Sequence, residues 1–211
     1  MTPITRRSVA SLLPVLAAAA AILATPAAAA AATRNVTMND GYAYSPNPVT
    51  AALGTAVKWQ NNSAITKHDV NATKPNKYFS SGNAAGIHTG QSFTFTFSSA
   101  GTFSYICLAH SGEGMRGTVV VPMQVKRLSG SPERFKVIVG SAAIPSSSPW
   151  ERVVQVDVPG GGQHYNAIKT TRAASFKYTP SARGTYRFRS YLKSTNGAGQ
   201  SQTSPVALIS H

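Results

Sequence analysis

Apolar and polar residues alternate along much of this chain with the two-residue period of a β-strand. Phe93, Phe95 and Phe97 alternate with threonines, so one face of the segment 92–97 is aromatic and the other carries hydroxyl groups. This pattern predicts a half-buried antiparallel strand. Further segments rich in Val, Phe, Tyr and Thr are residues 56–62, 102–107 and 117–121.

The spacing of turn residues favours an all-β fold. Gly, Pro and Asn recur about every eight to twelve residues, and beyond the N-terminal segment no stretch keeps a helical period. Short strands at this spacing are typical of a β-sandwich.

Composition and charge divide the chain near the stretch KRLSGSPE. Residues 33–125 carry a net charge of +3 and residues 126–211 carry +9, out of +14 for the whole chain. Each part is long enough for one small core. We therefore predict two β-domains, at residues 33–125 and 134–211, joined by a linker at residues 126–133.

The N-terminal segment has the pattern of a signal peptide. Arg6 and Arg7 precede an apolar, alanine-rich run with several A-x-A sites, so residues 1–32 are expected to be removed. The alternative is a membrane anchor, which Pro14 and Pro26 disfavour. Whether export uses the general or the twin-arginine route stays open. We expect a bacterial protein that is secreted, periplasmic or associated with the cell envelope, with no nucleic-acid partner.

The single cysteine of the chain, Cys107, is unusual for an exported protein. Cysteines in an oxidising compartment normally occur in pairs. Cys107 therefore forms an intermolecular bond, lies buried and inert, or takes part in chemistry.

The stretch SYICLAHSGEGMRGTVVV places two other soft or borderline donors beside this cysteine. Cys107, His110 and Met115 follow the spacing C-x2-H-x4-M, with Gly112 and Gly114 allowing a tight loop between two strands. Two histidines, a cysteine and a weak axial methionine are the donors of a blue-copper centre. His68, after the segment that contains Trp59, is the candidate for the second histidine.

Other uses of these residues are possible on the sequence alone. Cys107 and His110 also suit a catalytic nucleophile and its base, although no third orienting residue is evident. Zinc accepts the same donors but rarely a thioether. His88, His164 and His211 are expected at the surface.

Residues 34–122 resemble a cupredoxin of the plastocyanin group, the type 1 blue copper proteins. The resemblance lies in YSPNPVTAALGTAVKWQNNS, in His68, and in HTGQSFTFTFSSAGTFSYICLAHSGEGMRGTVVV. It implies a Greek-key sandwich that binds one copper ion through His68, Cys107, His110 and Met115. It also implies single-electron transfer, with redox partners docking at His110 beside Leu108 and Ala109.

One residue departs from the pattern of this family. Asp69 follows the first histidine, where plastocyanins commonly have Asn. In the family this position helps to link the two ligand-bearing loops. We therefore expect altered hydrogen bonds around the site and an altered reduction potential.

The second part of the chain is less informative. Residues 184–206 resemble the closing strands of a fibronectin type III or immunoglobulin-like module, with Tyr186 and Phe188 as framework aromatics. Arg187 and Arg189 are expected on the opposite face of this strand. That face is either simply solvated or contacts an anionic cell-envelope surface or an acidic protein.

These patterns lead to two functional hypotheses, neither of them enzymatic. The first is an exported electron carrier that cycles one copper ion between Cu(I) and Cu(II). The alternative is an envelope protein that stores or delivers copper, or an adhesion-type protein without a redox role.

Overall fold

The computed structural model of the chain describes residues 32–83 and 86–211. This part contains sixteen β-strands and no helix, which confirms the predicted all-β fold class. None of the described residues therefore forms a helix long and apolar enough to cross a bilayer. The predicted signal peptide lies outside the described residues, apart from residue 32.

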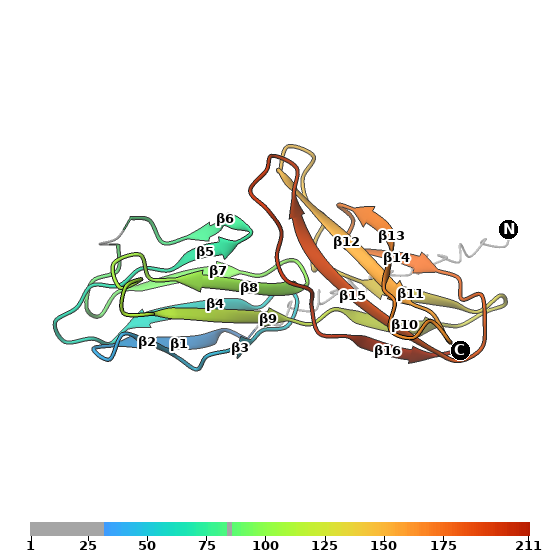
Figure 1. Cartoon of the computed structure of the whole chain (residues 1–211), viewed down its shortest axis with the longest axis horizontal. Coiled ribbons are helices and arrows are strands. Elements are labelled where there is room, and N and C mark those ends of the chain that lie inside the picture. Colours follow the sequence, from blue (N-terminus) through green and yellow to red (C-terminus); the bar gives the residue numbers. More distant parts are fainter. Residues whose placement is uncertain (1–31, 84–85) are drawn as a thin grey trace, which may run out of the picture. The chain divides into compact units, whose positions relative to one another are not determined.

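The first half of the described chain forms two sheets (Figure 1). The four-stranded sheet has the order β2 (Ala43–Ser45), β1 (Arg34–Asn39), β4 (Ala56–Asn61), β7 (Ser92–Thr96). The five-stranded sheet has the order β3 (Val49–Thr50), β9 (Arg116–Val121), β8 (Gly101–Ile106), β5 (Asn71–Lys74), β6 (Asn76–Ser80). Two pairs, β1 with β4 and β3 with β9, are parallel, and the other pairs are antiparallel.

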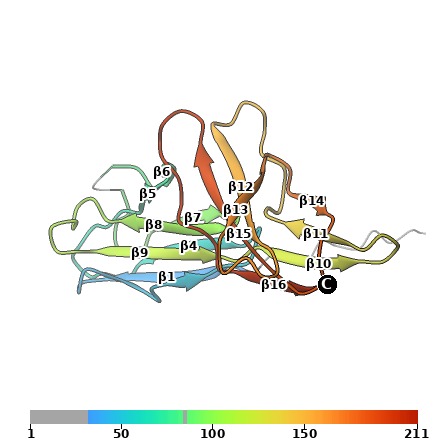
Figure 2. The ribbon, with the colours of Figure 1, turned by 45° about the vertical axis from the view of Figure 1, so that its right-hand side comes forward.

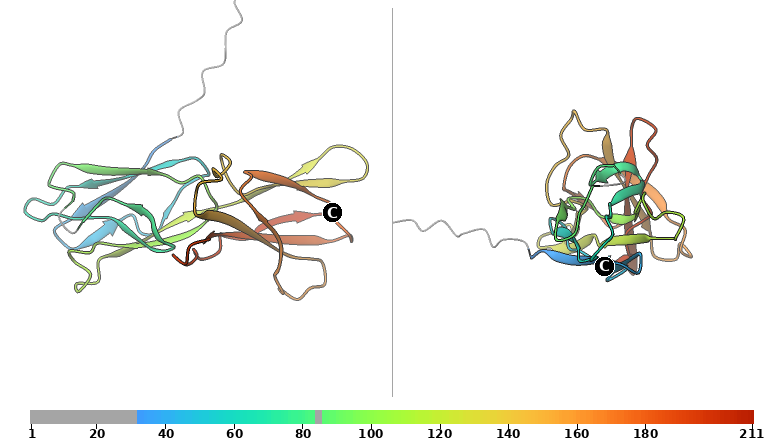
Figure 3. Two further views of the ribbon diagram at one scale, coloured as in Figure 1. Left: turned by 90° about the horizontal axis from the view of Figure 1, so that it is seen from above. Right: turned by 90° about the vertical axis from the view of Figure 1, so that its left-hand side faces the viewer.

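The strands of these two sheets can be followed from two further directions in Figure 3. Their inner faces share one aromatic core. Trp59 has no exposed surface, and its ring lies 5.4 Å from Tyr105 and 5.8 Å from Phe79 between ring centroids. Phe93 and Phe95 pack against this core while the threonines beside them are exposed, as the alternation predicts. Large rings buried between the two sheets make a rigid base for the loops at the ends of the sandwich.

Position 117 must be glycine because the ring of Tyr105 packs directly against its backbone. Gly117 in β9 lies opposite Tyr105 in β8, and the Tyr105 ring occupies the space that any side chain at position 117 would need. A strand glycine at such a point is typical of close packing between neighbouring groups.

The second half of the described chain forms two further sheets (Figure 1). The three-stranded sheet has the order β10 (Gln124–Leu128), β11 (Arg134–Ile138), β14 (Ser175–Tyr178). The four-stranded sheet has the order β13 (Asn166–Thr171), β12 (Trp150–Asp157), β15 (Thr185–Ser194), β16 (Ala207–Ser210). All of these pairs are antiparallel.

These two sheets enclose a second core, in which Tyr186 and Phe188 are fully buried as expected. The Tyr186 hydroxyl accepts hydrogen bonds from the backbone N–H groups of Ser181 and Ala182 and donates to the Ala182 carbonyl. A tyrosine bonded to the backbone a few residues upstream is typical of a corner in immunoglobulin-like sandwiches. The likeness of this part to such modules stays a prediction.

The predicted linker 126–133 is partly a strand. Residues 126–128 belong to β10, because β10 pairs along its whole length with β11. Residues 31–211 form a single compact unit, with bridges between Ser99 and Gly140 and between Thr102 and Gln202. The proposed division into two domains therefore stays a prediction.

Arg152 joins segments that are far apart in the sequence. Its guanidinium is fully buried and donates five hydrogen bonds, at 2.9–3.1 Å. The acceptors are Ser99 Oγ and the carbonyls of Ser98, Ala142, Arg172 and Ala173. Burial lowers the pKa of this guanidinium, but the ring of acceptors compensates for the lost hydration.

We predict that Arg152→Met lowers the free energy of unfolding by about 3 kcal/mol or more, because it leaves several buried acceptors without donors. Urea denaturation of the whole protein measures this change. Arg183→Met, at an exposed position, is the control and should change stability by less than about 0.5 kcal/mol. Equal stability of the two variants would contradict the structural role of Arg152.

Candidate metal centre

His68 is positioned by backbone pairing outside the regular strands. Its N–H donates to the Ile87 carbonyl at 3.0 Å, and the Ile87 N–H donates back to the His68 carbonyl at 2.9 Å. The loop before it is organised by buried Asn61, whose amide donates to the carbonyls of Thr66 and Ile87. The position of His68 is therefore fixed by bonds to a segment nineteen residues further along the chain and by the loop that precedes it.

Cys107, His110 and Met115 lie in the connection between β8 and β9 (Figure 2). The Cys107 N–H donates to the Met115 carbonyl at 3.0 Å, and the Met115 N–H donates to the His110 carbonyl at 3.1 Å. Gly114 has a φ of +79°, in the left-handed region that favours glycine, so the predicted turn is present. The loop thus closes on itself and brings its donors to one side.

The structure brings three predicted ligands together. The Cys107 sulfur lies 3.9 Å from His68 Nδ1 and 3.3 Å from His110 Nδ1. The ligand atoms of these three residues all lie within 4.8 Å of one another. Met115 is 1% exposed and is linked to the other loop residues by its backbone, so its side chain is buried at the same end of the sandwich.

Asp69 links the two loops, as its position suggested. Its fully buried carboxylate accepts hydrogen bonds from the N–H groups of Leu108 at 2.7 Å and Ala109 at 3.2 Å. The Cys107 thiol donates to the same carboxylate at 3.5 Å. An Asn side chain can accept from the loop and also donate to the sulfur, whereas an ionised Asp only accepts. The residue that departs from the family pattern therefore lies directly against the sulfur.

The surroundings shift the pKa of the His68 imidazole in the direction that favours metal binding, but they shift the pKa of the Cys107 thiol in the opposite sense. Burial, and secondly the nearby His110, lower the pKa of His68, which favours the neutral ring that metals require. Burial raises the pKa of the Cys107 thiol, and the charge of Asp69 acts in the same direction. The metal must therefore displace the proton of Cys107 when it binds.

The donor set fits copper better than the alternatives. Two imidazole nitrogens around one sulfur, with a thioether in the same loop, match the trigonal set of a type 1 copper centre. Structural zinc normally takes four Cys or His donors, and only three such residues cluster here in the described part of the chain. Cys107 has no exposed surface, a position unsuited to attack on a substrate.

The outer side of the centre is partly covered by aromatic and aliphatic groups. The Tyr42 ring lies against the His110 ring, with centroids 4.5 Å apart and planes inclined by 32°. Leu108 is 46% exposed and Tyr42 is 40% exposed. Among the four predicted ligands, His110 alone is not fully buried, and Tyr42 lies against its ring.

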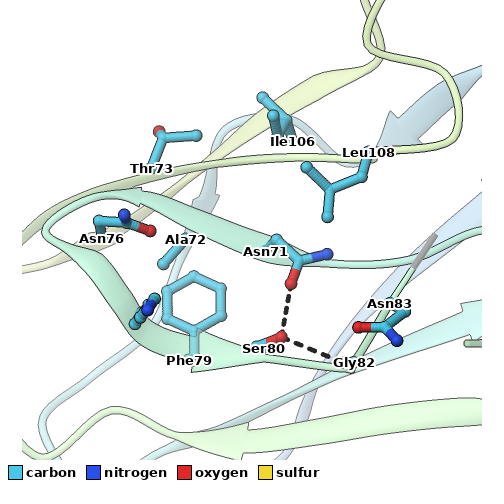
Figure 4. Close-up of a pocket in the computed structure, with 11 residues that line it drawn as sticks. Asn71, Ala72, Thr73, Asn76, Phe79, Ser80, Gly82, Asn83, Ile106 and Leu108 are labelled. Atoms are coloured by element: carbon cyan, nitrogen blue, oxygen red, sulfur yellow. Dashed lines mark hydrogen bonds between the residues drawn. The ribbon is translucent and has the colours of Figure 1, made fainter.

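A groove of about 470 Å³ runs beside the strand that leads to Cys107 (Figure 4). Ile106, Leu108 and Phe79 supply its apolar part, and Asn71, Ser80 and Asn83 supply polar groups. Its lining includes none of the four predicted ligands, so the groove borders the centre without opening onto the donor atoms.

Sequence reasoning missed two residues that shape the site, Asn61 and Tyr42. An Asn at the end of a strand, before a polar loop, is a signal for side-chain bonding to the backbone, and it could have identified Asn61. The sequence holds no signal that places Tyr42 over His110, because the two belong to different loops.

Comparison with known proteins supports the copper assignment. Residues 30–122 match the family model described as "Copper binding proteins, plastocyanin/azurin family". A plastocyanin from Scenedesmus fuscus is 32% identical over 85 residues, which are 37% of this chain and 85% of the plastocyanin. A halocyanin from Natronomonas pharaonis is 30% identical over 83 residues, which are 39% of this chain but only half of the halocyanin.

Solved structures with detectable similarity include a purple cupredoxin from Nitrosopumilus maritimus. It is 24% identical, has a TM-score of 0.37, and the match covers 42% of this chain and 98% of the cupredoxin. An oxidised amicyanin with a single substitution is 26% identical, has a TM-score of 0.36, and the match covers 42% of this chain and 80% of the amicyanin.

The family model falls on the segment that carries the His68, Cys107 and His110 donors. Through residues 30–122, the chain therefore belongs to the plastocyanin/azurin family of copper-binding proteins.

Proposed function

We propose that this protein is an exported type 1 copper protein that carries single electrons between redox partners. The observation that carries this proposal is the convergence of His68, Cys107 and His110, whose donor atoms lie within 4.8 Å of one another. Members of the family are typically electron-transfer copper proteins rather than enzymes.

The ligands in this proposal are the four that the sequence indicates. His68 Nδ1, Cys107 Sγ and His110 Nδ1 would hold the ion, with the Met115 thioether as a fourth, weaker donor. Copper bound there supplies a one-electron couple between Cu(I) and Cu(II).

The surrounding structure favours rapid electron transfer by keeping the donors in place. Backbone bonds fix His68 to Ile87 and Cys107 to Met115, and Asp69 connects the two loops. Donors held in this way need little movement when the charge at the centre changes. Their arrangement therefore does not depend on reorganisation of flexible loops.

Electrons would enter and leave through the edge of His110. This ring is half-buried and lies against Tyr42, and Leu108 and Ala109, which precede it in the same loop, are exposed. An apolar surface of this kind suits brief contact with a redox partner, because it loses little hydration energy on docking.

The proposed location outside the cytoplasm is supported by the N-terminal pattern of two arginines, an apolar run and A-x-A sites. A secreted, periplasmic or envelope-bound copper protein would contact partners in the same compartment. Storage or delivery of copper would need the same donors but no reversible redox cycle, so voltammetry separates the two functions.

We predict that Cys107→Ser abolishes the intense visible absorption of the copper-loaded protein, because the thiolate provides the charge-transfer band. The β-sheet circular dichroism should be unchanged, since serine is nearly isosteric. Ser111→Ala, in the same loop, is the control and should keep the colour. A coloured Cys107→Ser variant, or a colourless natural protein with copper bound, would rule out the type 1 centre.

We predict that Asp69→Asn raises the reduction potential of the bound copper. The change removes a buried negative charge 3.5 Å from the sulfur and adds an N–H donor towards it. Both effects stabilise the reduced site relative to the oxidised one. Voltammetry of the two proteins measures the difference.

Asp40→Asn is the matched control for this charge change. Asp40 is exposed and bonded to the loop residues Ser63 and Ala64. Its charge acts weakly on the His68 ring through solvent, but unlike Asp69 it does not contact the sulfur. Its potential should stay close to that of the natural protein. An unchanged or lower potential in Asp69→Asn would show that the Asp69 carboxylate does not tune the site.

We predict that Leu108→Glu slows electron self-exchange at least tenfold, because two like charges would meet where two His110 faces come together. Nuclear magnetic resonance line broadening in mixtures of both oxidation states measures this rate. Val206→Glu, at a residue of similar exposure (45%), should leave it unchanged. Equal rates in both variants would place electron exchange elsewhere on the surface.

A further inference from the structure

Three lysines form a single row across the three-stranded sheet. Lys126 of β10 is directly opposite Lys136 of β11, and Lys136 is directly opposite Lys177 of β14. The three strands are neighbours in the sheet (Figure 2). Neighbouring strands lie about 4.8 Å apart, so the row presents one cation at each strand separation.

This row lies on the solvent side of the sheet. All three lysines are exposed, while Phe135 and Val137, which alternate with Lys136, are fully buried in the second core. Arg134 lies two residues from Lys136 and therefore faces the same side. The same face thus carries four cations.

Acidic side chains do not neutralise this face. Among the residues after position 125, the only acidic ones are Glu133, Glu151 and Asp157. Within the described residues they form ion pairs with Arg127 and His211, with Arg172, and with Arg187, respectively. No ion pair of the described residues involves the three lysines.

The sequence predicts a basic face for β15, but its arginines are paired within the fold, unlike the three lysines. Arg187 lies 3.2 Å from the carboxylate of Asp157. Arg189 donates to Gln155 at 2.7 Å, and its guanidinium carbon lies 3.8 Å from the centre of the Tyr165 ring. These two arginines are engaged within the fold, whereas the lysine row is free to bind.

Stability alone does not explain the lysine row. Like charges directly opposite one another on a sheet are destabilising. Lysines on edge strands do prevent aggregation between sheets, and β10 and β14 are the edges here. However, β11 is the central strand, so Lys136 has no edge to protect.

We propose that this face binds a linear acidic polysaccharide that carries one carboxylate on each sugar ring. One pyranose ring spans roughly one strand separation, so successive carboxylates of such a chain would meet Lys126, Lys136 and Lys177 in turn. Lysine is a point charge on a flexible stem, so it suits a flexible polymer whose anionic groups are not held in one planar orientation. The interaction is independent of the copper centre.

The row geometry also distinguishes this ligand from a membrane surface. The positions on one side of the row are Gln124, Ile138 and Ser175, which are uncharged. On the other side, Leu128 faces Arg134. Three of the four cations on this face therefore lie along one line, which fits a linear polymer better than a two-dimensional layer of lipid headgroups.

Binding of the whole protein to polygalacturonate at low and increasing NaCl concentration tests this proposal. In the variant Lys126→Gln/Lys136→Gln/Lys177→Gln, binding should be about a hundredfold weaker, since three basic groups at an anionic surface are lost. The dependence of log K on log salt should also become shallower, because fewer counterions are released.

A second triple variant provides the matched control. Lys77→Gln/Lys169→Gln/Lys193→Gln removes the same charge from exposed positions elsewhere and should weaken binding only a few-fold. Equal loss in both variants would overturn the proposal, because net charge alone would then explain binding. So would failure of the natural protein to bind polygalacturonate, or tighter binding to polyglycerol phosphate or to vesicles with phosphatidylglycerol.

The outcome is separable from that of the copper proposal. Replacing the three lysines removes repulsion between like charges and breaks no buried contact, so the urea midpoint of unfolding should not fall. The visible spectrum of the copper-loaded variant should also be unchanged. A loss of polysaccharide binding with intact colour supports the row as a separate surface.

Discussion

The buried carboxylate of Asp69 connects the two loops that hold the donor atoms. It directly follows His68 and accepts the backbone N–H groups of Leu108 and Ala109, next to Cys107. Without this connection, only the packing of the underlying sheets would keep His68 close to Cys107. The same carboxylate contacts the sulfur, so one side chain both positions the donors and affects their electrostatics.

The core beneath the site supports the loops that carry the donors. Trp59, Phe79 and Tyr105 fill the space between the two sheets, and β8 and β9 extend from this packing directly into the loop that carries Cys107, His110 and Met115. A site built on packed strands maintains its geometry better than one on long flexible loops. This rigidity agrees with a centre that exchanges an electron and forms no new covalent bond.

Positive charge is distributed unevenly between the two halves of the chain. The copper-binding half carries a net charge of only +3, and under the proposed function the exposed Tyr42 and Leu108 would lie where redox partners dock. The second half contains most of the positive charge, and its acidic residues are already paired. Retention at an anionic polymer by one face would leave the His110 edge free to contact partners.

The sequence by itself determined the all-β class and the strands around Trp59 and Cys107, because alternation is a local property of the chain. It also indicated four candidate donors, of which the structure brings His68, Cys107 and His110 together. It did not reveal the position of Tyr42 against His110, the role of Asn61, the buried Arg152, or the lysine row. Each of these depends on which strands and loops become neighbours. Only the tertiary structure decided them, because register and loop contacts join residues that are distant in sequence.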